Sequence, residues 1–104
     1  MRWYHYLAYF FGGLFLANAF PHWTQGISGH AFQSPFASPP GEGLSTAPVN
    51  VLWGLANFAV AYLLTARVGR FDLRNNRHAL PFFVGMVVIS LVGAWHFGRF
   101  HGGL

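Results

Sequence analysis

Hydrophobic and polar residues alternate along this chain in long blocks. Three blocks contain no charged residue, and they cover residues 3–20, 49–66 and 79–97. As an α-helix, each block would extend about 27 Å, close to the roughly 30 Å hydrocarbon thickness of a bilayer. Aromatic residues stand near an end of each block, as rings do at membrane interfaces. The pattern predicts an all-α membrane protein with three transmembrane helices.

The segments between these blocks differ in character, and together they predict a single membrane domain over residues 1–104. Residues 21–48 hold five of the six prolines, a density that excludes a long helix or a central strand. We therefore expect a long Pro/Gly-rich extracytoplasmic loop without regular structure, ordered as a cap because it also carries apolar side chains. Residues 67–78 form a basic cytoplasmic loop, and residues 98–104 form an outer tail.

The arginines predict the orientation of the chain. Four of them lie in the loop between the second and third blocks, namely Arg67, Arg70, Arg74 and Arg77. Arg2 falls on the same side of the membrane, and only Arg99 falls on the other. Because positively charged loops stay in the cytoplasm, the N-terminus is expected inside and the C-terminus in the periplasm.

Composition supports a membrane location and limits the possible chemistry. Apolar residues make up 54% of the chain and charged residues 8%, against about 25% charged in soluble domains. The basic loop, with four arginines and Asp72, supplies most of the net charge of +4, so the expected partner is the lipid bilayer and not nucleic acid. There is no cysteine, which excludes disulfides and thiolate chemistry. Ala17-Asn18-Ala19 resembles a signal-peptide cleavage site, but the aromatic first block with Gly12 and Gly13 favours an uncleaved helix.

Polar and small residues share one face of the second block, and this stripe consists of Asn50, Gly54, Asn57, Ala61 and Thr65. A polar side chain in hydrocarbon needs a partner, so the stripe should face protein. It indicates either helix packing or the lining of a solute path. Asn57 lies near the midplane and should find a hydrogen-bond partner. Ser90 is one candidate, and Asn18 is less favoured because it lies nearer the outer surface.

Small residues in the first and third blocks predict close helix packing. Ala8 and Gly12 share a face of the first block, and Gly85 and Gly93 share a face of the third. Small side chains let helix backbones approach in membranes, so a compact three-helix bundle with these faces turned inward is expected.

Histidines offer the main candidate chemistry beyond packing. His22, His30, His96 and His101 would all lie on the outer side, where imidazoles could ligate zinc or copper, or simply anchor the interface. Two haem pairs are conceivable, His5 with His78 and His22 with His96, but three short helices leave little volume. We therefore predict no cofactor, with zinc, copper and haem as alternatives.

No catalytic constellation is present, because Glu42 is the only acid among the outer segments, so no enzyme activity is expected.

The segment FPHWTQGISGHAFQSPFASPPGEGLS, followed by VNVLWG, resembles a family of small bacterial membrane proteins with no assigned function. The resemblance implies a bacterial inner membrane. The expected function is helix packing, as an accessory subunit of a membrane complex or as a homo-oligomer, with another membrane protein or itself as partner. The alternatives are a small transporter or channel lined by the polar stripe, and a metal or haem binder.

Overall fold

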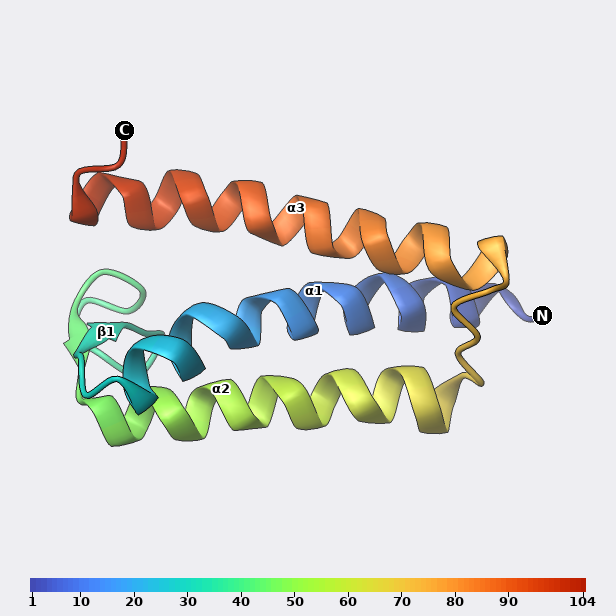
Figure 1. Ribbon diagram of the computed structural model, residues 1–104, viewed down its shortest axis with the longest axis horizontal. Coiled ribbons are helices and arrows are strands. Elements are labelled where there is room, and N and C mark those ends of the chain that lie inside the picture. The colour runs from blue at the N-terminus through green and yellow to red at the C-terminus, as the bar shows by residue number, and fades with distance from the viewer.

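A computed structural model describes residues 1–104 and shows an all-helical chain 41 Å long (Figure 1). The helices are α1 (Trp3–Ile27), α2 (Ala47–Tyr62) and α3 (Asn76–His101). α2 runs directly into a π-helical segment, η1 (Leu63–Val68). Between α1 and α2, strands β1 (Phe32–Gln33) and β2 (Leu44–Ser45) form a short antiparallel ladder.

The three helices form a row in which α1 is central. α1 packs against α2 on one side and α3 on the other, so it separates the two flanking helices (Figure 1). The three helices are therefore packed side by side, and the expectation of a compact bundle with all three small faces turned toward one another is wrong. The reason is the number of small residues on α1, which allow two neighbours to approach it from different sides.

Glycines bring α1 and α3 together at two reciprocal contacts. A Cβ on Gly13 would collide with the Phe82 carbonyl of α3, and a Cβ on Gly85 would collide with the Phe10 carbonyl of α1. At both points the backbone of one helix occupies the space that a Cβ of the other helix would fill. The crossing therefore depends on glycine at both positions.

Glycines also allow close contact between α1 and α2 with its continuation η1. A Cβ on Gly54 would lie 2.7–2.9 Å from Trp23, and a Cβ on Gly26 would lie 2.8 Å from the Ala47 carbonyl. Near the other end, a Cβ on Gly12 would lie 2.6 Å from the Thr65 methyl group. The two helices are thus in close contact along most of their length.

The outer segment is shorter and more regular than the sequence predicts. α1 does not end at residue 20 but continues through Pro21 to Ile27, so the connection to α2 spans residues 28–46. Tertiary contacts of Trp23 and Gly26 with α2 stabilise this last part of the helix against the break that Pro21 favours. The expectation of no regular structure also fails at the β1–β2 ladder.

The other helices extend slightly beyond their predicted blocks. α2 with η1 covers residues 47–68, and α3 covers residues 76–101. Asn75 begins α3, because its side chain accepts a hydrogen bond from the backbone N–H of Arg77 and satisfies a free donor of the first turn. The basic connection is therefore confined to residues 69–75.

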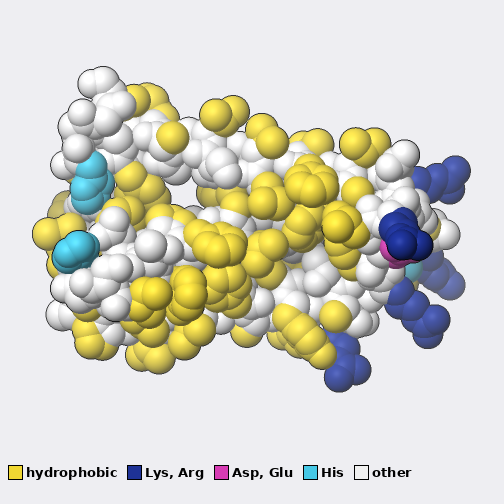
Figure 2. Space-filling model, viewed as in Figure 1, with side chains coloured by type: hydrophobic (Ala, Val, Ile, Leu, Met, Phe, Trp, Pro, Cys, Tyr) yellow, Lys and Arg dark blue, Asp and Glu magenta, His cyan; other side chains and the backbone are white.

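Very little of the chain is buried, and many large hydrophobic side chains are exposed on the surface of the helices. Of 104 residues, 16 are buried, and in α3 only Gly85 is. Figure 2 shows hydrophobic side chains along the molecule, arginines gathered at the end that carries the N-terminus, and histidines at the opposite end. Two helical stretches, Ala47–Val68 and Asn76–His101, are long and apolar enough to cross a membrane.

Candidate functional sites

The polar stripe of α2 lies against α1. Asn50, Gly54, Asn57 and Ala61 are all buried, and the Thr65 methyl group contacts Gly12. The Thr65 hydroxyl donates a 2.8 Å hydrogen bond to the Ala61 carbonyl of its own helix. The stripe therefore faces protein along its whole length.

Asn57 finds its partner on α1. The Asn57 side chain is 1% exposed, and its Oδ1 accepts a 3.1 Å hydrogen bond from Asn18 Nδ2. Its own Nδ2 donates to the Trp53 carbonyl at 2.8 Å. The preference for Ser90 over Asn18 as the partner is wrong, because α2 packs on α1 and not on α3.

Asn50 joins three parts of the outer end. Its fully buried Nδ2 donates toward the carbonyls of Phe32, Ser45 and Thr46 at 3.1–3.2 Å. Its Oδ1 then accepts from His22 Nδ1 at 3.0 Å. Asn50 thus connects α1 and the loop of residues 28–46, called the cap loop from here on, to the start of α2.

His22 lies beyond the apolar block 3–20 and is 3% exposed. Because an amide oxygen can only accept, the 3.0 Å contact between His22 Nδ1 and Asn50 Oδ1 requires a proton on Nδ1.

The four outer histidines do not converge on one point. Each has a different partner: His22 with Asn50, His30 with Gln25, His96 with the Gly41 carbonyl, and His101 with Gln33. No group of three or more His, Cys, Asp or Glu side chains is placed to hold a metal ion. At the other end, the rings of His5 and His78 both pack on Tyr9. His96 and His101 instead connect α3 to the cap loop.

The predicted close-packing residues behave differently from one another. Ala8 and Gly12 are buried, and Gly85 is in contact with α1. Gly93 departs from the expectation, since a Cβ there would meet only Phe97 of the same helix. Gly13, which neighbours Gly12 but is not among the predicted close-packing residues, makes the second contact with α3.

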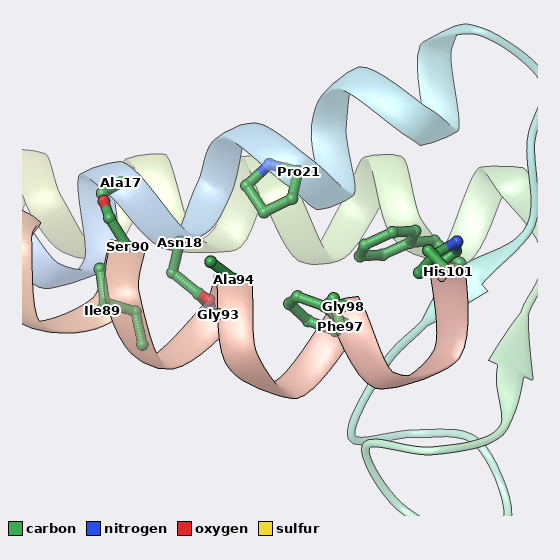
Figure 3. Close-up of a pocket in the computed structure, with 11 residues that line it drawn as sticks. Ala17, Asn18, Pro21, Ile89, Ser90, Gly93, Ala94, Phe97, Gly98 and His101 are labelled. Carbon is green, nitrogen blue, oxygen red and sulfur yellow. The ribbon is translucent and has the colours of Figure 1, made fainter. Parts of the chain in front are cut away.

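The space that Gly93 faces is a slot of about 430 Å³ between α1 and the C-terminal half of α3. Figure 3 shows Ala17, Asn18 and Pro21 of α1 on one side of it and residues of α3 on the other. On the α3 side, small residues recur at every fourth position, namely Ser90, Ala94 and Gly98. The hollow between the helices is also visible in Figure 2.

The fold defines an all-helical protein with two helices able to cross a membrane by length and composition. No protein-family model, curated protein or solved structure matches this chain.

Proposed function

We propose that this chain is an integral membrane protein that crosses the bilayer three times. α1 lies between two helices that are each apolar enough to span, so a membrane crossed by α2 and α3 is crossed by α1 as well. The 41 Å length fits the 40–45 Å of a bilayer with its headgroups. The arginines at one end support an orientation with the N-terminus in the cytoplasm. The proposal of a bacterial inner membrane follows from the resemblance of the outer-loop sequence to small bacterial membrane proteins.

Within the membrane, the chain acts by helix packing as a subunit of a larger assembly. The observation that carries this proposal is the slot between α1 and α3, whose α3 side presents Ser90, Ala94 and Gly98. Small residues four apart allow a second helix to approach closely. In this chain the slot separates this face from α1, and at its end Leu104 lies 3.0 Å from a Cβ placed on Gly98. The occupant we propose is a transmembrane helix of another subunit or of a second copy.

The absence of cysteine allows a direct test in native membranes. A single cysteine replaces Ala94, on the α3 side of the slot, and a bifunctional thiol or thiol-to-amine crosslinker with a short spacer is added. The matched control is Val92→Cys, which lies at nearly the same depth of α3, is 52% exposed and does not line the slot.

We expect Ala94→Cys to give a discrete crosslinked species and Val92→Cys to give none. A dimer of this chain identifies a homo-oligomer, and a crosslink to one other membrane protein in fixed stoichiometry identifies a heteromeric complex. Equal crosslinking from both positions, or none from Ala94→Cys, contradicts docking at the slot.

The contacts of the polar stripe favour packing over a solute path. The side-chain polar groups of Asn50, Asn57 and Thr65 form hydrogen bonds inside the chain. Gly54 and Gly12 are in close contact with the opposite helix, so no passage runs along the stripe within one chain. A transporter would therefore need its path elsewhere, between subunits.

A further inference from the structure

A second cavity lies at the opposite end of the molecule from the cap, where η1 meets the N-terminus. Its volume is about 510 Å³. The polar residues that line it share a capacity to donate hydrogen bonds, and they are Met1, His5, Tyr9, Arg67, Arg70 and His78. No Asp or Glu side chain lines it.

Tyr9 forms the floor of this inner cavity and is fixed in place. Its side chain is 1% exposed, and its ring is in contact with Gly69, where a Cβ would lie 2.6 Å from the hydroxyl oxygen. The Tyr9 oxygen accepts a 3.0 Å hydrogen bond from the backbone N–H of Arg70. Since a phenol can both accept and donate, the Tyr9 O–H remains free to donate.

The two histidines of the inner cavity are donors for a structural reason. His5 Nδ1 accepts from the Arg2 backbone N–H at 3.0 Å, and His78 Nδ1 accepts from the Asp72 backbone N–H at 2.9 Å. A ring nitrogen that accepts carries no proton, so the proton of each neutral ring sits on Nε2. Neither Nε2–H is hydrogen-bonded within the chain.

The nearest acid is already engaged elsewhere. Asp72 Oδ1 accepts a 3.0 Å hydrogen bond from the Arg74 backbone N–H, within the turn that precedes α3. The inner cavity is therefore lined by two arginines, two histidines and a tyrosine, with no carboxylate. The Arg67 guanidinium lies 6.0 Å from the centre of the Tyr62 ring, so this exposed side chain would turn toward the cavity on binding a ligand. A site whose polar side chains can all donate, two of them cationic, is complementary to an anion with several acceptor oxygens.

We propose that the inner cavity binds a phosphate group. Arg67 and Arg70 supply the charge and the paired N–H groups that suit phosphate oxygens, and Tyr9, His5 and His78 fix its position. The phosphate belongs either to the headgroup of an anionic phospholipid in the adjoining leaflet or to a soluble phosphate compound. The site lies at one end of the helix row, where both sources would reach it.

The chain provides a control with the same change in net charge. The test variant is Arg67→Gln with Arg70→Gln, and the control is Arg74→Gln with Arg77→Gln, two nearby arginines that do not line the inner cavity. Arg67 and Arg70 are both exposed, so the fold should tolerate the test variant. Folding of both variants is checked by gel filtration and circular dichroism in detergent.

The binding of phosphatidylglycerol and of phosphatidylcholine to the purified protein is measured by native mass spectrometry, and the binding of inorganic phosphate by calorimetry. Since each cation near an anionic headgroup contributes several-fold to affinity, the test variant should bind phosphatidylglycerol about 10- to 30-fold more weakly, with the control much less affected.

Loss confined to phosphatidylglycerol identifies a lipid site. Inorganic phosphate binding that the test variant loses in lipid-free detergent identifies a soluble ligand, whether or not the helices span a membrane. Equal effects in the two variants, or no preference for phosphatidylglycerol together with no phosphate binding, overturn the proposal.

Discussion

Replacing Asn50 by leucine tests whether this residue holds the outer end together. Leucine has a similar volume, so the change removes hydrogen bonds without creating a large cavity. The His22 ring N–H would lose its acceptor, and the carbonyl of Phe32 would lose its side-chain donor. Each buried polar group left unpaired costs about 1–3 kcal/mol, so the expected loss in unfolding free energy is about 2–5 kcal/mol.

Asn57→Leu is the matched comparison, because it makes the same substitution two turns further along α2. Here the Trp53 carbonyl accepts within its own helix, and Asn18 borders the open slot. The change therefore removes one hydrogen bond between helices, worth about 0.6 kcal/mol and at most about 2 kcal/mol. With the typical value of about 0.6 kcal/mol for Asn57→Leu, Asn50→Leu should be the more costly of the two by about 1.4 kcal/mol or more.

The assay is reversible unfolding in mixed micelles of increasing dodecyl sulfate content, followed by the fluorescence of the four tryptophans. Limited proteolysis adds a local measurement, because Asn50→Leu should speed cleavage in the cap loop and Asn57→Leu should not. Equal destabilisation by the two variants, or a cap loop equally protected in both, would refute the role assigned to Asn50.

Two further predictions concern packing and orientation. Gly85→Ala should destabilise the protein by about 1–3 kcal/mol in the same unfolding assay, because its Cβ collides with the Phe10 carbonyl, whereas Gly93→Ala should change stability by less than about 0.5 kcal/mol. Similar effects at both positions would contradict the α1–α3 crossing. Reporter fusions at Arg70 and Leu104 should report cytoplasm and periplasm respectively, since five arginines lie at one end and one at the other. A cytoplasmic Leu104 would invalidate the three-span proposal if Arg70 is also cytoplasmic, and would invert its orientation if Arg70 is periplasmic.

The sequence predicts the helices well because their apolar blocks are long, and it predicts the inward face of α2 because polar residues recur there at helical spacing. It does not predict which helix lies in the centre, since all three blocks carry small residues. The continuation of α1 past Pro21 depends on contacts of Trp23 and Gly26 with α2, which no local pattern contains. For the same reason the partner of Asn57 was misjudged.

The inner cavity shows a similar limit. The arginines between α2 and α3 are conspicuous in the sequence, but their number alone indicates only orientation. The cavity also needs His5 and Tyr9 from the start of α1, more than 50 residues away, and the Arg2 backbone N–H that places the His5 proton on Nε2. Such a set is brought together by the position of α1 against η1.

The central position of α1 bears on its polar residues, since α1 lies between the two helical stretches that are long and apolar enough to cross a membrane. A helix that faces lipid on most sides must be apolar all round. A helix flanked by protein on both sides can carry polar groups, provided its neighbours supply their partners. α1 does so at Tyr9 with the Arg70 backbone, at Asn18 with Asn57 and at His22 with Asn50. Tyr9, Asn18 and His22 thus attach α1 to the rest of the chain, which is the behaviour expected of a helix that lies between two others.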